Sequence, residues 1–213
     1  MKFVVTAGPT REYLDPVRFL SNPSTGKMGF AVARAAAMRG HEVALVAGPV
    51  SLKTPKGVRR IDVTSAREML AAVERELSQQ TSGAVFVSTA AVADWRPAKC
   101  ASRKLKKGQM SDTLKLVRNP DILKTVARRS KGVCFVGFAA ETNDVLAEAR
   151  RKCREKNLDM IVANDVTEKG SGFGVDTNRV TFVRKDGSVD RLPLMTKLAV
   201  ARRIVRECED LRP

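Results

Sequence analysis

The sequence predicts an α/β fold in which a mainly parallel sheet lies between two layers of helices, followed by an antiparallel β-hairpin near the C-terminus. Two observations lead to this expectation. Short apolar runs, typical of strands buried on both faces, alternate with segments whose apolar residues recur at helical spacing. Near the C-terminus this order gives way to two short strands around a turn. The chain of 213 residues is 43% hydrophobic, which suffices for one core, so we expect one domain over residues 1–213.

Strand and helix candidates alternate along most of the chain. Strands are expected at residues 3–7, 43–47, 60–63, 84–88, 133–138 and 158–163. Helices are expected at residues 28–39, after the capping box of Ser65 and Glu68, after Asn119, at residues 144–156 and around residues 198–208. Because parallel neighbours are joined by a crossover, usually a helix, this order predicts a Rossmann-like three-layer arrangement.

The segment of about residues 165–194 departs from this alternation. Two short strands at 180–184 and 189–192 flank the turn residues Asp186 and Gly187. We predict a hairpin arm that adds a strand across a subunit interface, which makes it a dimerisation element. An edge hairpin within one subunit is equally compatible with the pattern.

The charge balance favours anionic partners without choosing among them. A formal net charge of +16 attracts nucleotides, phosphorylated metabolites and nucleic acid alike. Aromatic residues make up only 5% of the chain, which argues against the stacking platforms of RNA-recognition and single-strand-binding folds. A basic nucleic-acid-binding module remains the alternative that the charge supports.

A phosphate-binding helix start is predicted just before the helix at residues 28–39. Ser24 or Thr25 is expected to cap this helix, while Gly26 and Gly29 let the backbone approach a ligand or the sheet. The N–H groups of the first turn would then face a bound anion. An ordinary capped helix start without a ligand is the alternative interpretation.

Neither standard nucleotide loop fits this segment. Ser21 and Met28 stand where a P-loop needs a glycine and a magnesium-binding hydroxyl. The dinucleotide fingerprint needs three glycines directly after the first strand, but Ser24 takes the first place and a polar insertion intervenes. The strand at 43–47 also ends without an acid for a ribose, which weighs against a nicotinamide oxidoreductase.

Further polar residues follow the later strands. Asp94 comes after the strand at 84–88, at the sheet edge where ligands of parallel α/β folds bind, although a turn or cap residue is the simpler interpretation. Residues of about 96–113 are rich in lysine and arginine and predict a mobile basic lid loop over phosphates. A solvated charge run is the alternative.

Two helix features also allow a structural interpretation. Asn119 is expected to cap a helix with Pro120 at its first position. Lys152 and Lys156 are four residues apart on one helix face, which on its own indicates a solvated lysine face.

Residue types exclude several kinds of chemistry. His41 is the only histidine and lies in a helix-to-strand turn, so histidine triads and histidine metal sites are not expected. The four cysteines have no metal-binding spacing and are expected to be reduced packing residues. No apolar run is long enough for a membrane span and no signal peptide is evident, so we expect a cytoplasmic protein. Catalysis would therefore depend on positioned lysines, amides and helix N-termini.

Eight blocks of the sequence together form a recognisable set. They are Thr6-Ala7-Gly8-Pro9-Thr10-Arg11-Glu12, Asp15-Pro16-Val17-Arg18, Ser21-Asn22 through Lys27-Met28-Gly29, Ala90-Ala91-Val92-Ala93-Asp94, Lys104-Leu105-Lys106-Lys107, Asn119-Pro120-Asp121-Ile122-Leu123, Val136-Gly137-Phe138-Ala139-Ala140-Glu141-Thr142 and Ala163-Asn164-Asp165. In this order the blocks resemble phosphopantothenate–cysteine ligase, and the resemblance to this family runs from Val5 to about Leu198.

The resemblance implies a two-step ligation in coenzyme A biosynthesis. The carboxylate of 4′-phosphopantothenate attacks the α-phosphate of CTP, which gives an acyl-cytidylate and pyrophosphate. The amine of L-cysteine then displaces CMP. ATP is the alternative nucleotide, because stand-alone relatives sometimes use it.

The resemblance also implies roles for individual residues. Lys104 would offset charge at the α-phosphate, and Asn22 would hold the acyl group and donate to the developing oxyanion. The residues implied to bind nucleotide are Ser88, Thr89, Ala90, Asp94, Lys104, Asn119, Pro120, Asp121, Ile122, Phe138, Lys152 and Lys156. Those implied to bind the acyl substrate are Asn22, Ser24, Thr25, Gly26, Lys27 and Ala91. Mg²⁺ would screen the triphosphate, with Asp94 as a candidate ligand.

The implied partners are the three substrates, a second copy of the chain in a homodimer, and a phosphopantothenoylcysteine decarboxylase. Many bacterial members carry this decarboxylase as an N-terminal fusion, whereas this chain starts at the first ligase strand, which predicts a stand-alone enzyme or an excised domain. No nucleic acid or membrane partner is implied.

Overall fold

The computed structural model describes residues 1–79, 83–106, 112–141, 143–165, 167–168, 170–172 and 174–211. Within these residues, eight strands form the central sheet: β1 (Lys2–Ala7), β4 (Glu42–Ala47), β5 (Arg59–Asp62), β6 (Ala84–Ser88), β9 (Val133–Glu141), β10 (Met160–Asp165), β12 (Val180–Arg184) and β13 (Val189–Arg191). The strands lie in the order β13-β12-β10-β9-β6-β1-β4-β5, and the six from β10 to β5 are parallel. The predicted fold class is confirmed.

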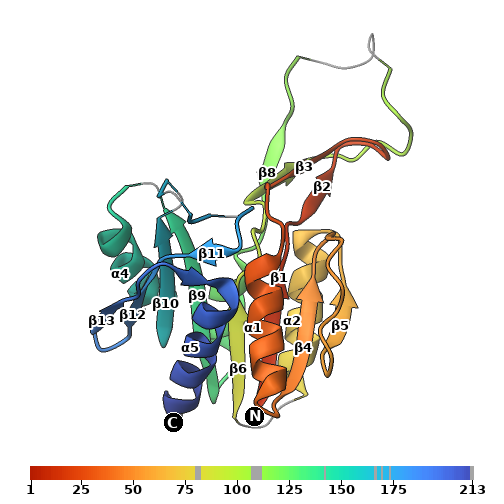
Figure 1. Cartoon of the computed structure of the whole chain (residues 1–213). Coiled ribbons are helices and arrows are strands. Elements are labelled where there is room, and N and C mark those ends of the chain that lie inside the picture. The colour runs from red at the N-terminus through yellow and green to blue at the C-terminus, as the bar shows by residue number, and fades with distance from the viewer. Residues whose placement is uncertain are drawn as a thin grey trace.

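Helices cover both faces of this sheet (Figure 1). They are α1 (Lys27–Met38), α2 (Ala66–Ser78), α3 (Ile122–Arg129), α4 (Val145–Glu155) and α5 (Lys197–Asp210). Phe3 and Val5 of β1 pack in the cluster that includes α1 and α5, whereas Val4 packs in the cluster of α2, α3 and α4. Successive residues of a strand point to opposite faces, so the unbroken apolar run of β1 supplies both halves of the core.

The C-terminal hairpin is part of the central sheet. Strand β12 pairs antiparallel with β10, and β13 pairs antiparallel with β12 at the sheet edge. The predicted strands are confirmed, and the structure agrees with the edge-hairpin interpretation of this segment. Val166, Lys169 and Phe173 of the predicted arm lie outside the described residues. A role in dimerisation stays a prediction.

A different segment projects from the sheet, beyond the carboxyl ends of the parallel strands (Figure 1). It consists of two antiparallel pairs, β2 (Arg11–Tyr13) with β3 (Phe19–Ser21) and β7 (Trp95–Pro97) with β8 (Leu116–Arg118). We call these four strands and the described residues between the members of each pair the projecting arm.

The basic lid loop predicted for about residues 96–113 begins with two residues that belong to a strand. Arg96 and Pro97 belong to β7, which pairs with β8, and the guanidinium of Arg118 lies 5.1 Å from the ring centre of Trp95. The basic segment is therefore the connection of a hairpin. Its residues 107–111 lie outside the described residues, so its mobility stays a prediction.

Candidate active site

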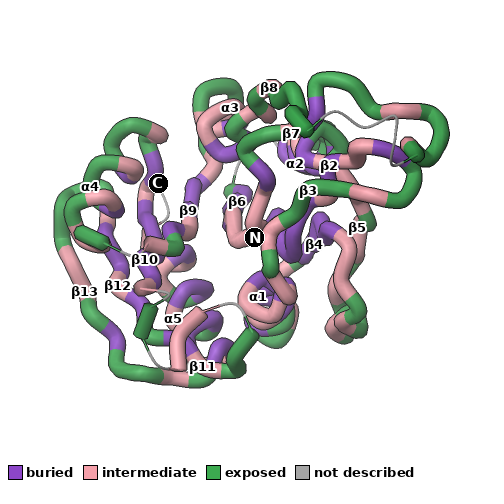
Figure 2. The backbone as a smooth tube through the Cα atoms, turned by 90° about the horizontal axis from the view of Figure 1, so that it is seen from above, coloured by how far each residue is buried: buried purple, intermediate pink, exposed green. Residues whose placement is uncertain are grey.

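A cavity of about 140 Å³ lies where the parallel strands end and helices α1 and α5 begin. Figure 2 views the chain from this side, with α1, α5, β6, β9 and β10 around the same region. The cavity is lined by Ser24, Thr25, Gly26, Lys27, Met28, Gly29, Thr89, Ala90, Ala91, Phe138, Ala139, Ala140, Asn164, Gly172, Asn178 and Lys197. The structure thus brings together residues that the resemblance assigned to two different substrates.

The start of α1 differs from the prediction. Its N-cap is Gly26, in a left-handed conformation with φ 78°, so Ser24 and Thr25 do not cap the helix. The Ser24 hydroxyl instead accepts a hydrogen bond from the Gly26 N–H at 3.3 Å. Glycine has no side chain to offer the first-turn N–H groups, and the residues of this turn line the cavity. Such a helix start would suit an anion, and we call it the anion seat.

Gly29 places this helix start directly on the strand ends. A Cβ atom at Gly29 would lie 2.5 Å from the Ala7 Cβ and 2.5 Å from the Thr89 hydroxyl oxygen. The Thr89 hydroxyl donates to the Thr6 carbonyl at 2.6 Å, which fixes the segment after β6 against β1. Only glycine permits this approach, so the anion seat is held close to the predicted nucleotide residues Thr89 and Ala90.

Asn22 adjoins the cavity without lining it. Its amide nitrogen donates to the carbonyls of Ala91 at 3.1 Å and Val92 at 3.2 Å. Asn22 therefore braces the chain before α1 against the chain after β6, next to Ala91 in the cavity wall. To donate to a substrate oxygen, the amide would have to exchange one of these two carbonyl acceptors.

Some predicted nucleotide residues form a second group and do not line the cavity. The Asn119 N–H donates to the Asp94 carbonyl at 2.7 Å, and the Asn119 amide nitrogen donates to the Ala93 carbonyl at 2.8 Å. The predicted cap was wrong: Asp121 is the N-cap of α3, and its carboxylate accepts from the Lys124 N–H at 3.0 Å. Pro120 therefore precedes the helix, and the Asn119 side chain is hydrogen-bonded to the Ala93 carbonyl and does not cap the helix.

Lys152 and Lys156 join α4 to its neighbours. Lys156 pairs with Asp121 at 2.8 Å, and Lys152 pairs with Glu141 at the end of β9. Burial opposes ionisation of Asp121, but hydrogen bonds from Lys156 and the Lys124 N–H hold its pKa below the ordinary value. The two lysines are thus paired side chains at the α3–α4 side of the sheet, and neither lines the cavity.

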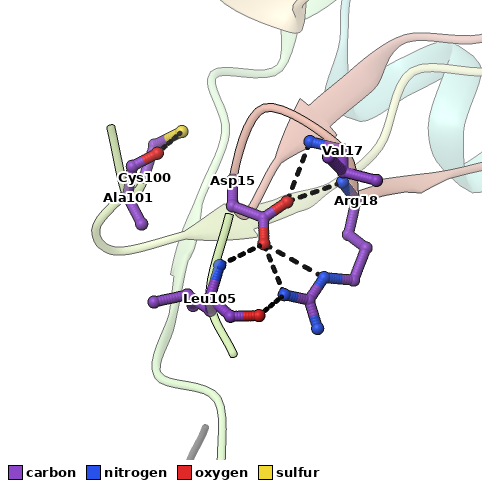
Figure 3. A network of polar contacts seen from close by, with 6 residues as sticks. All are labelled: Asp15, Val17, Arg18, Cys100, Ala101 and Leu105. Carbon is purple, nitrogen blue, oxygen red and sulfur yellow. Dashed lines mark hydrogen bonds and ion pairs between the residues drawn. The ribbon is translucent and has the colours of Figure 1, made fainter. Parts of the chain in front are cut away.

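Leu105, the residue after Lys104, is held by Asp15 and Arg18 from the other hairpin of the projecting arm (Figure 3). The fully buried Asp15 carboxylate accepts from the Leu105 N–H at 3.1 Å, while Arg18 donates to the Leu105 carbonyl at 2.7 Å. The hydrogen-bonded guanidinium of Arg18 holds the pKa of Asp15 well below its usual range. Lys104 itself is exposed and does not line the cavity, so its contact with a nucleotide stays a prediction.

Asp94, the candidate magnesium ligand, does not belong to a cluster of metal-binding side chains among the described residues. In the part of the chain that the structure describes, no group of three histidine, cysteine or acidic side chains could hold a metal ion. Mg²⁺ is usually bound by one or two carboxylates together with substrate phosphates, and it keeps several waters. The exposed Asp94 fits that kind of site.

Three polar residues of the cavity wall were missed by sequence reasoning. Asn164, Asn178 and Lys197 are 8%, 3% and 5% exposed. Lys197 donates to the carbonyls of Gly172 at 2.9 Å and Val175 at 2.6 Å. Burial, together with the charge of Lys27, lowers the pKa of Lys197 to about 8. Asn164 ends a buried strand and could have been chosen on that ground, whereas no local pattern marks the other two.

His41 and the four cysteines do not line the cavity. His41 bonds to Glu209 at 2.7 Å and stacks on Phe3, near the start of β1 and away from the cavity. The four cysteines are free, and three of them are buried. Among the described residues, no helix is both long and apolar enough to cross a membrane.

A parallel sheet that ends at an uncapped helix N-terminus, beside small residues after β6 and β9, defines a Rossmann-like domain whose cavity would suit an anionic ligand. The chain belongs to the family described as DNA/pantothenate metabolism flavoprotein C-terminal domain, whose sequence profile matches residues 1–211. The predicted resemblance to phosphopantothenate–cysteine ligase is confirmed at the level of the family.

Relatives of known name support this assignment. The chain is 52% identical over 203 residues to the coenzyme A biosynthesis bifunctional protein CoaBC of Vibrio cholerae, with 94% of this chain and 50% of the relative covered. It is 51% identical over 205 residues to CoaBC of Bacillus subtilis, covering 96% of this chain and 50% of that one. A crystal structure of the C-terminal domain of CoaBC matches with a TM-score of 0.83 and 44% identity, covering 99% of this chain and 94% of that chain. The chain thus spans about half the length of these curated relatives and matches their C-terminal half.

Proposed function

We propose that the chain ligates 4′-phosphopantothenate to L-cysteine with CTP in coenzyme A biosynthesis, through a 4′-phosphopantothenoyl-CMP intermediate and with release of CMP and pyrophosphate. The observation that supports this best is the cavity, where the anion seat at Ser24 to Lys27 adjoins Thr89, Ala90 and Phe138. An acyl carboxylate and a nucleotide bound there would meet at the end of β6. The names of the bifunctional relatives place them in the same biosynthesis.

In the first step, a carboxylate oxygen of 4′-phosphopantothenate forms a bond to the α-phosphorus of CTP. The bond from this phosphorus to the bridging oxygen breaks, and pyrophosphate leaves with the electron pair. Both reactants are anions, so the step depends on cations and oriented N–H groups. The first turn of α1 and Lys27 supply these in the cavity, and Lys104 would add a charge from the basic segment. Mg²⁺ would screen the triphosphate, with Asp94 as the candidate ligand.

In the second step, the cysteine nitrogen forms a bond to the acyl carbon. The bond from that carbon to the phosphate oxygen breaks, CMP leaves with the electron pair, and the nitrogen releases one proton. We assign Asn22 to the oxyanion that develops on the acyl oxygen. Its amide lies next to Ala91 in the cavity wall and would give up one carbonyl acceptor for the substrate.

The nucleotide preference rests on the resemblance, and ATP remains the alternative. Pyrophosphate release should be measured with phosphopantothenate and magnesium in the presence of CTP, ATP, GTP or UTP, each with and without cysteine. We expect release that needs phosphopantothenate and is fastest with CTP. Release with ATP alone would overturn the nucleotide assignment, and no release with any nucleotide would overturn the ligase proposal.

A homodimer forms part of the proposal, and apolar exposure on the projecting arm supports it. Large apolar side chains of the arm are exposed, among them Val17 at 55%, Trp95 at 44% and Leu116 at 40%. We expect the wild type to have twice the monomer mass in light scattering and Leu116→Asp to have the monomer mass. As a control, Met38→Asp changes an exposed apolar residue of α1, outside the arm. A Leu116→Asp variant that stays dimeric would place the interface elsewhere, for example at the C-terminal hairpin.

The proposed location of the protein is cytoplasmic.

A further inference from the structure

The basic segment after β7 is tied at two points to the turn between β2 and β3. At the first point, the Ala101 N–H donates to the Leu14 carbonyl at 2.9 Å. At the second point, the Leu105 N–H donates to the Asp15 carboxylate at 3.1 Å. Lys104 lies between these two points, so its backbone is held on both sides by one short turn.

The Asp15 carboxylate is fully buried although it lies in a turn. It accepts from the N–H groups of Val17 and Arg18 at 2.9 and 2.8 Å, and from the Arg18 guanidinium at 3.0 and 2.5 Å. A buried charge is costly unless it is paired and hydrogen-bonded, and these bonds within the turn meet that need. The additional bond from Leu105 therefore serves to hold a segment that is distant in the sequence.

Arg18 completes this attachment, as Figure 3 shows. Its guanidinium bonds to the Asp15 carboxylate and also donates to the Leu105 carbonyl at 2.7 Å. Both backbone groups of Leu105 are thus bonded to one ion pair, and charge-assisted bonds of this kind fix orientation as well as position. The arginine also offsets the charge of Asp15, so the carboxylate attracts the nearby ammonium of Lys104 less. We call the bonds of Asp15 and Arg18 to Leu105 the arm latch.

We propose that Asp15 is a positioning residue of the first half-reaction, which holds Lys104 in place through the backbone of Leu105. This inference rests on the proposed function, in which Lys104 offsets charge at the α-phosphate. A lysine on an unanchored loop would lose backbone freedom whenever a nucleotide binds, and this loss opposes binding. Because the arm latch orders the neighbouring backbone beforehand, only the exposed side chain of Lys104 remains to be ordered.

The test compares Asp15→Asn, Lys104→Gln and the double variant in single-turnover pyrophosphate release with phosphopantothenate, CTP and magnesium, without cysteine. Asp15→Asn removes the charge and places an NH₂ group among the donors of Arg18 and Leu105, so the arm latch opens. We expect release to slow about 10- to 100-fold, because a misplacement of about 1 Å has an effect of this size. The double variant should be no slower than Lys104→Gln, because Asp15 acts through Lys104.

A nitroxide label on Cys100 measures the order of the segment without any substrate. Cys100 is exposed and the other three cysteines are buried, so the label should react at this position. We expect a slowly moving label in the wild type without nucleotide and a faster one in Asp15→Asn. A label that moves freely in the wild type would overturn the inference, even if Asp15→Asn does not fold, because the segment would then not be ordered beforehand.

Glu207→Gln is the matched control. Arg184 of β12 donates to Glu207 of α5 at 2.9 and 2.7 Å, so this variant also loses a bond between a carboxylate and a guanidinium group. It should release pyrophosphate at the wild-type rate.

Three outcomes would overturn the inference without touching the ligase proposal. The first is wild-type release in folded Asp15→Asn, and the second is wild-type release in Lys104→Gln. The third is a double variant slower than Lys104→Gln by the full factor of Asp15→Asn, because independent losses multiply. If the wild type releases no pyrophosphate with any nucleotide, the proposed function fails, and the role of Asp15 in it fails too.

Discussion

Gly29 is the position where α1 comes closest to the strand ends, and Gly29→Ala should lower activity much more than stability. The added methyl group would lie 2.5 Å from the Ala7 Cβ, 2.5 Å from the Thr89 hydroxyl and 2.9 Å from the Thr6 carbonyl oxygen. Carbon atoms in contact prefer roughly 3.5–4.0 Å, so the helix start has to move by about 1 Å. The anion seat moves with it, because Gly26 begins the same helix.

The size of both effects follows from this displacement. Overpacking of a core costs about 1–3 kcal/mol, and the better helix propensity of alanine offsets about 1 kcal/mol. We therefore expect the free energy of unfolding to fall by at most about 2 kcal/mol and Tm to fall by at most about 8 °C. A misplacement of about 1 Å in a catalytic constellation lowers a rate by about 100-fold, and this loss should appear in pyrophosphate release.

Thermal unfolding and single-turnover pyrophosphate release measure the two effects separately. Gly174→Ala serves as the stability control, because a methyl group there meets nothing within 4 Å. A Gly29→Ala variant with wild-type pyrophosphate release would refute the reasoning, since the seat would then not need to lie so close to the strand ends. Equal Tm losses in both glycine variants would show that the contacts of Gly29 are not what destabilises it.

Three further predictions concern other residues. Asn22→Asp should let the acyl-nucleotide accumulate while amide formation slows by about 100-fold, because a carboxylate cannot donate to the oxyanion. Equal loss of both half-reactions would mean that Asn22 only braces the structure. Lys104→Gln should slow the first half-reaction, and unaltered pyrophosphate release would remove Lys104 from the α-phosphate. Burial lowers the pKa of Lys197 from an ordinary 10.5 to about 8, and Lys27 and Asp176 are the charged groups that face it. Between these two pH values the unfolded chain binds more protons than the folded chain. The free energy of unfolding therefore rises with pH across that window. Denaturant unfolding at pH 7.5 and 10 should show a smaller rise for Lys197→Met; an equal rise would contradict the assignment.

Local sequence patterns predicted the central elements well. The six expected strands correspond to β1, β4, β5, β6, β9 and β10. Five of them are apolar runs, because strands buried on both faces require such runs, whereas β5 is a partly exposed strand at the sheet edge. The start of α2 was also predicted, and the Ser65 hydroxyl accepts from the Glu68 N–H at 3.3 Å. These features depend on residues close together in the sequence.

Predictions failed where a residue had a distant partner. The cap of α3 went to Asp121 because the amide of Asn119 bonds to Ala93, which precedes it by 26 residues. Strand β7 was missed because it is short and is stabilised by pairing with β8 across the basic segment. Neither partner can be read from the composition of a local window.

The sequence by itself determined the alternation of strands and helices, the position of the single histidine in a helix-to-strand turn and the resemblance to a ligase family. Only the tertiary structure decided which residues share the cavity. Asn178 and Lys197 follow the last parallel strand by many residues, and they reach the wall because β12 turns back beside β10 and α5 packs beside α1. Periodicity and capping act over a few residues, whereas a binding cavity depends on strand order, which sets the neighbours of every strand end.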